Sequence, residues 1–285
     1  MSAMNAPDPE QFSGSAKVRL LRRRGKQRVP LRQRMHADQL RKGVYLIPSL
    51  FTAGNLMCGF FSIIATFYGE YVNAALLILL ANVFDGVDGY VARLTRTTSQ
   101  FGVEFDSLAD VVAFGVAPGI LVYFWALLPW QTWGWLAAST YVVCGALRLS
   151  RFNVQAQGLA KSHFVGLPIP AAAQMITSSV ILYNYLGGAT APNRHLVFLL
   201  VVYGLAALMV SNIPYFSLKN NDIRKRHPHW MLVSGLILIT LIIAERQIMF
   251  FTIVLVYTLS GPLLWCLTAF KHRRELRREA VKIAP

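Results

Sequence analysis

Residues 85–110 read DGVDGYVARLTRTTSQFGVEFDSLAD and lie between two long apolar segments. This stretch holds five of the thirteen Asp and Glu residues of a 285-residue chain in which only 14% of the residues are charged. Soluble globular chains carry about 25% charge, so the composition excludes a disordered chain, a nucleic-acid-binding domain and an ordinary cytosolic enzyme. In the polytopic membrane protein that remains, carboxylates are costly and indicate a functional site.

Hydrophobic segments of about 20 residues, the length that spans the hydrocarbon of a bilayer, flank this stretch and recur along the chain. We expect eight spans, at about 47–68, 71–94, 104–128, 131–154, 169–187, 194–216, 230–245 and 248–269. The predicted fold class is therefore all-α, a polytopic membrane helix bundle of about eight transmembrane helices.

The net charge of the chain is +15, and its basic residues are concentrated in the segments expected on one side of the membrane. The two tails and alternate loops hold 26 of the 28 Lys and Arg residues. The positive-inside rule therefore predicts that both termini and the loops with Arg96, Lys161 and Arg224 lie in the cytoplasm, which requires an even number of spans. We expect a multi-pass protein of the cell (cytoplasmic) membrane, surrounded by membrane lipids and without a nucleic-acid partner.

The spacing of the acidic residues predicts that their side chains converge. Two helix faces carry them together with small residues and one arginine: Asp85, Asp88, Gly89, Ala92 and Arg93 on the first, and Gly102, Asp106 and Asp110 on the second. A tight loop turns the two faces toward each other. Four carboxylates that close require a cation, and hard oxygen ligands without His or Cys indicate Mg²⁺, Mn²⁺ or Ca²⁺, with room for two ions. Such ions suit phosphoryl chemistry, because they clamp the attacking and the leaving oxygens.

The full pattern, Asp85-x2-Asp88-Gly89-x2-Ala92-Arg93-x8-Gly102-x3-Asp106-x3-Asp110, resembles the signature of the CDP-alcohol phosphatidyltransferases. The resemblance covers about residues 44–215 and implies six membrane helices around a polar cavity that faces the cytoplasm. It also implies that the four aspartates bind two divalent ions, Mg²⁺ or Mn²⁺, that Asp110 is the general base, and that the protein is a homodimer. The expected organisation is a basic cytoplasmic tail with a candidate interfacial helix, a six-helix core, two further spans and a second basic cytoplasmic tail, at residues 1–45, 46–216, 217–270 and 271–285.

The resemblance also implies a pocket for CDP-diacylglycerol. The motif positions and two positions of the first span form it: Gly89, Ala92, Arg93, Ser99, Gly102, Thr52 and Asn55. For Asn55, hydrogen bonding inside the membrane is an equally good interpretation.

Two shorter segments bear on the acceptor alcohol. The segments RLSRFN at residues 148–153 and FVGLPIP at residues 164–170 resemble those of the membrane-integral, phosphatidylserine-forming members of the family. The resemblance implies that Arg148, Arg151 and Asn153 bind L-serine, and arginine suits bidentate binding of its carboxylate. Alternatively, both arginines are positive-inside charges.

The expected activity is therefore that of an enzyme that transfers the phosphatidyl group of CDP-diacylglycerol to L-serine, giving phosphatidylserine and CMP by metal-assisted direct displacement. One alternative is the same chemistry with glycerol 3-phosphate, inositol phosphate or choline. A cation transporter is the alternative from another class, although the acids lie at helix ends and no internal repeat is visible.

Overall fold

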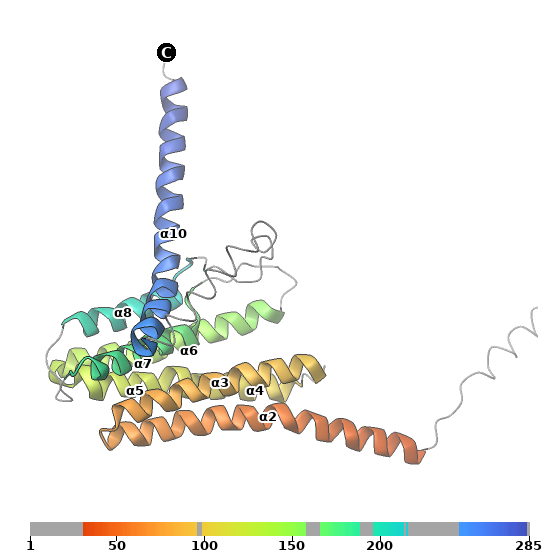
Figure 1. The fold of residues 1–285 in the computed structure, drawn as a ribbon. Helices are drawn as coiled ribbons and strands as arrows, with labels where there is room; N and C mark the ends of the chain where they lie inside the picture. Colours follow the sequence, from red (N-terminus) through yellow and green to blue (C-terminus); the bar gives the residue numbers. More distant parts are fainter. Residues whose placement is uncertain are drawn as a thin grey trace, which may run out of the picture. The chain divides into compact units, whose positions relative to one another are not determined.

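The computed structural model describes residues 31–95, 99–157, 166–188, 196–213, 215 and 245–283, with side chains described between Ser49 and Leu267. By its contacts the chain divides into two units, Met1–Leu46 and Ile47–Pro285, and the second contains every candidate site residue. The described residues are helical apart from short connections (Figure 1). The all-helical prediction is therefore confirmed for this part of the chain.

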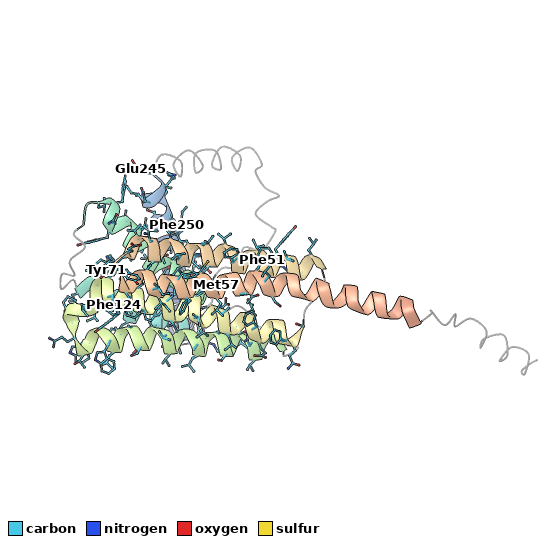
Figure 2. All side chains as sticks on the ribbon, turned by 90° about the horizontal axis from the view of Figure 1, so that it is seen from below. Phe51, Met57, Tyr71, Phe124, Glu245 and Phe250 are labelled. Carbon is cyan, nitrogen blue, oxygen red and sulfur yellow. The ribbon has the colours of Figure 1, made fainter. Side chains whose placement is uncertain are left out.

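The elements follow one another as α2 (Leu31–Phe67), α3 (Tyr71–Thr95), α4 (Gln100–Asp110), η2 (Val111–Val116), α5 (Ala117–Val122), η3 (Tyr123–Leu127), η4 (Leu128–Trp130), α6 (Thr132–Gln157), α7 (Ile169–Tyr185), α8 (Leu196–Val210) and α10 (Arg246–Ile283). Helix α6 packs on α8, whereas α7 packs against both α3 and α10. In Figure 2, Tyr71 and Phe124 lie at the same end of the bundle, and the Tyr71 hydroxyl donates to the Phe124 carbonyl oxygen at 3.3 Å.

Four stretches of the described residues are long and apolar enough to cross a membrane, which supports a membrane protein: Ser49–Phe67, Tyr71–Leu94, Gln100–Trp130 and Arg246–Leu267. They fall on four of the spans expected from the sequence. The expected span at 230–245 lies outside the described residues, as does most of the first tail.

Helix α8 ends at Val210, earlier than the expected boundary near residue 216. The sequence Ser-Asn-Ile-Pro at residues 211–214 accounts for the early end. Proline disfavours the helical conformation of the residue before it, and it has no N–H group with which to continue a helix.

The third span, from α4 to η4, contains two π-helical turns, η2 and η3. Pro118, at the start of α5, has no N–H group to donate to the carbonyl oxygen of Phe114 four residues earlier. The wider turn of η2 accommodates the proline ring, and the buried Tyr141 hydroxyl of α6 donates to the Phe114 oxygen at 3.0 Å. This span therefore changes its winding directly after Asp110, the last residue of α4.

Replacing Tyr141 by Phe should lower the stability of the bundle, because the buried Phe114 oxygen loses its donor. An unpaired buried polar group costs about 1–3 kcal/mol. Thermal unfolding in detergent should give a lower midpoint for Tyr141→Phe than for Tyr90→Phe, which removes a hydroxyl from an exposed ring. Equal midpoints would contradict a structural role for this hydrogen bond.

Candidate metal and substrate site

The ends of α3 and α4 that flank the short connection between them bring three acidic side chains together. One carboxylate oxygen from each of Asp85, Asp88 and Asp106 lies within 4.8 Å of the other two. Asp88 is buried and the other two are half-buried. Helical spacing explains the arrangement, because Asp85 and Asp88 are three residues apart on one face of α3.

Asp110 lies beside this triad but is not part of it. Its carboxylate is buried, and its negative charge interacts with those of Asp85, Asp106 and Asp88. It stands one helical turn beyond Asp106, where α4 gives way to the π-helical turn η2. The structure thus places all four aspartates in one acidic cluster and separates Asp110 from the three that converge most closely.

Helix α2 supports the acidic cluster through two buried side chains. The Thr52 hydroxyl donates to Oδ2 of Asp88 at 2.9 Å, and Nδ2 of Asn55 donates to Oδ1 of Asp110 at 3.2 Å. Both residues lie on one face of α2, and each fixes the orientation of one carboxylate. Two positions predicted for the CDP-diacylglycerol pocket therefore hydrogen-bond to two of the predicted metal ligands.

Two buried oxygens of this region make no hydrogen bond within the described residues, Oδ1 of Asp106 and Oδ1 of Asn55. A buried polar atom without a partner is costly, and three carboxylates at this separation repel one another. A hard divalent cation meets both conditions, because carboxylate oxygens are the ligands that such cations prefer. The residues present therefore fit a metal ion.

The small residues beside the cluster differ in the space around them. A Cβ atom on Gly89 would meet nothing within 4 Å, so the backbone of α3 is open there to a bulky ligand. The Ser99 hydroxyl accepts the Gly102 N–H at 3.0 Å and caps the start of α4. Ala92 is half-buried, and Arg93 is exposed in the last turn of α3.

The two arginines of the RLSRFN segment have different surroundings. Arg148 is buried, with its guanidinium carbon 5.3 Å from the centre of the Phe152 ring, and its charge interacts with Asp110. It makes no hydrogen bond to a residue that the structure describes. Arg148 is therefore a buried cation that lies near the acidic cluster.

Arg151, one turn further along α6, is engaged by the end of α8. Among the described residues it donates to four acceptors: the carbonyl oxygens of Met209, Val210 and Ser211, and Oδ1 of Asn212. Asn153 donates to the Ser107 hydroxyl of α4 at 2.8 Å. In this structure both side chains join α6 to neighbouring segments.

Gly166 of the FVGLPIP segment packs against Arg151 and the end of α8. Gly166 has a φ of 84°, and a Cβ atom there would lie 2.9 Å from an Arg151 side-chain nitrogen and 2.5 Å from the Met209 oxygen. Its N–H donates to the Ile213 oxygen at 2.9 Å. The motif glycine thus permits a close approach that no other residue allows.

One residue near Arg148 belongs to none of the sequence motifs. Tyr257 of α10 is half-buried, and it interacts electrostatically with Arg148. Nothing in the sequence distinguishes it from any other tyrosine in an apolar helix.

Comparison with known proteins places the site in a family. The family model for CDP-alcohol phosphatidyltransferase matches residues 45–213. A CDP-diacylglycerol–serine O-phosphatidyltransferase of Helicobacter pylori is 43% identical over 179 residues, which are 62% of this chain and 74% of the relative. A protein of the same name from Bacillus subtilis is 37% identical over 191 residues, 66% of this chain and 97% of the relative. An archaetidylserine synthase of Methanothermobacter thermautotrophicus is 39% identical over 173 residues, 59% of this chain and 69% of the relative.

The family model covers more than half of the chain, including the acidic cluster and both arginines, whereas α10 lies beyond it. The resemblance seen in the sequence is confirmed: this chain belongs to the CDP-alcohol phosphatidyltransferase family.

Proposed function

We propose that this chain transfers the phosphatidyl group of CDP-diacylglycerol to the hydroxyl of L-serine, giving phosphatidylserine and CMP. Membership of the family supports the transfer chemistry, and the names of the relatives support serine as the acceptor. The observation that carries the choice of acceptor is Arg148, which is buried near Asp110 and makes no hydrogen bond to the described residues. A buried cation needs an anionic partner, and serine brings a carboxylate.

The acidic cluster supports a site for two divalent ions, Mg²⁺ or Mn²⁺, with Asp85, Asp88, Asp106 and Asp110 as ligands. Ions held by these residues would neutralise the pyrophosphate and stabilise the charge on the leaving group. In this proposal Thr52 holds Asp88 in position for the ions.

The reaction then needs one proton acceptor, and we assign that role to Asp110. The serine hydroxyl oxygen attacks the β-phosphorus, the bond from this phosphorus to the bridging oxygen breaks, and CMP leaves with that oxygen. Asp110 takes the hydroxyl proton as general base, while Asn55 holds its carboxylate in place. The open space at Gly89 suits the nucleotide, and we assign Ala92, Arg93, Ser99 and Gly102 to the same pocket.

For the acceptor, we propose that Arg148 holds the serine carboxylate. Arg151 and Asn153 serve the same pocket by fixing α6 to α8 and α4. A phosphorylated acceptor would call for several cations around one phosphate, whereas Arg148 is the buried cationic side chain among the described residues. Choline would call for free aromatic faces, but the Phe152 ring already lies beneath a guanidinium.

The distribution of Lys and Arg supports eight spans with both termini and the active site in the cytoplasm. We also propose the domain division stated above, a polar cavity open to the cytoplasm, and a homodimer in the cell membrane.

Purified protein with Mn²⁺ or Mg²⁺ should release CMP from CDP-diacylglycerol when L-serine is supplied. Glycerol 3-phosphate, inositol phosphate and choline, offered in turn, should give little release, because none presents the carboxylate that Arg148 is proposed to bind. EDTA should abolish the release, and added Mn²⁺ should restore it. Release that depends on one of the other alcohols and not on serine would overturn the proposed acceptor.

Replacing Asp106 by Asn should weaken Mn²⁺ binding at least about tenfold, because a charged ligand bonded to a metal contributes more than a neutral amide. Electron paramagnetic resonance of free Mn²⁺ measures this without turnover. Glu104→Gln is the matched control, since it removes one negative charge from an exposed side chain of the same helix. Equal Mn²⁺ affinities for the two variants would contradict the metal site.

Replacing Arg148 by Ala should raise the serine KM at least about tenfold and leave the CDP-diacylglycerol KM within about threefold, because only the carboxylate loses its partner. Arg148→Lys should restore only part of the loss, because lysine keeps the charge but lacks the planar fork of the guanidinium. Arg151→Ala should instead lower the unfolding midpoint, because four acceptors at the end of α8 lose their donor. An unchanged serine KM in Arg148→Ala would contradict the proposal that Arg148 binds the serine carboxylate.

A further inference from the structure

The hydroxyl of Tyr257 differs from those of several other tyrosines in the bundle. Tyr71, Tyr141 and Tyr215 each donate to a backbone carbonyl oxygen, at 3.3, 3.0 and 3.1 Å. Tyr257 is half-buried and packs against the core, yet its hydroxyl makes no hydrogen bond to a residue that the structure describes. The hydroxyl of a tyrosine that packs against a core normally finds a partner, so this hydroxyl is available to a ligand.

Tyr215, which follows α8 in the sequence, holds Tyr257 and its neighbour Thr258 of α10 in place. The Tyr215 hydroxyl donates to the carbonyl oxygen of Thr258, and the rings of Tyr215 and Tyr257 lie 5.9 Å apart. The helix itself packs along α7. Tyr257 is therefore held in one register.

Arg148 has both Tyr257 and Asp110 within the range of its electrostatic interactions. Among the described residues, no hydrogen bond or ion pair joins the guanidinium to either group. Both groups are therefore near enough to the guanidinium to interact with it electrostatically, although neither is hydrogen-bonded to it. The centre of the Phe152 ring lies 5.3 Å from the guanidinium carbon, and the ring stabilises the cation.

A small hydroxy amino acid matches this arrangement group by group. With its hydroxyl toward Asp110, which would take the proton, its carboxylate would face Arg148. A carboxylate has two oxygens and about four acceptor sites, more than one guanidinium uses. A second donor beside Arg148 would bind the remaining positions, and the Tyr257 hydroxyl is such a donor.

We propose that Tyr257 donates a hydrogen bond to the carboxylate of the acceptor that Arg148 holds, so that α10 completes the acceptor pocket. This inference rests on the proposed function. It assigns a specificity-determining residue to a helix that lies beyond residues 45–213, the part matched by the family model. An amino alcohol without a carboxylate would leave both donors without a partner, which is how a site rejects an analogue that lacks a polar group.

The test compares Tyr257→Phe with Tyr215→Phe in the full-length protein. Each substitution removes one hydroxyl oxygen, and the two rings are in contact with each other. The rate of CMP release is measured at varied L-serine and saturating CDP-diacylglycerol. It is then measured at varied CDP-diacylglycerol and saturating L-serine. Tyr257→Phe should raise the serine KM about tenfold and keep the CDP-diacylglycerol KM within about threefold, because a hydrogen bond to a charged group is lost.

Tyr215→Phe should keep the serine KM within about twofold and lower the unfolding midpoint, because its hydroxyl bonds to backbone rather than to the acceptor. A further comparison uses ethanolamine. The preference of the wild-type protein for serine over ethanolamine should narrow in Tyr257→Phe and stay unchanged in Tyr215→Phe.

The outcomes separate the two hypotheses. Wild-type protein without serine-dependent CMP release would overturn the proposed function, and the role of Tyr257 with it. Serine-dependent release with an unchanged serine KM in Tyr257→Phe would overturn the role of Tyr257 alone. The same would follow if both variants raised the serine KM equally, because the effect would then come from displacement of α10.

Discussion

Three carboxylate oxygens that lie within 4.8 Å of one another repel strongly in an apolar bundle. The helices must hold them there against that repulsion, and much of the surrounding structure serves this end. Thr52 and Asn55 of α2 donate to two of the aspartates. The Ser99 cap begins α4 within one turn of the connection from α3. Divalent cations would turn the repulsion into binding energy, so the same constraint that makes the cluster costly makes it selective for a metal.

The widened helix after Asp110 belongs to the same arrangement. Pro118 prevents a regular hydrogen bond at Phe114, the turn opens, and Tyr141 of α6 supplies the missing donor. Because α6 also carries Arg148, the acidic cluster and the buried cation are tied together by this bond between the third span and α6. The hydrogen bond from Asn153 of α6 to Ser107 of α4 adds a second tie between the same two parts of the molecule.

The sequence predicted the helical class, four of the spans and the convergence of acidic residues, because each follows from local spacing along one helix. It could not separate Arg148 from Arg151. Both lie on the same face of α6 with the same charge, and only the end of α8, some sixty residues away in sequence, distinguishes them. Nor could it predict that Tyr257 would come near Arg148. That proximity depends on contacts between segments, which periodicity does not encode.

The junction at Arg151 also makes the number of residues in α6 matter. Three separate pieces of backbone, the segment at Gly166, the end of α8 and α6 itself, meet at one guanidinium. That contact sets the rotation of α6 about its own axis. A single residue inserted between Arg148 and Arg151 would turn Arg148 by about 100° relative to the anchored arginine, away from Asp110. Over evolutionary time, insertions and deletions should therefore be tolerated in the loops of this protein and rejected within those four positions, even where the new residue is apolar and helix-forming.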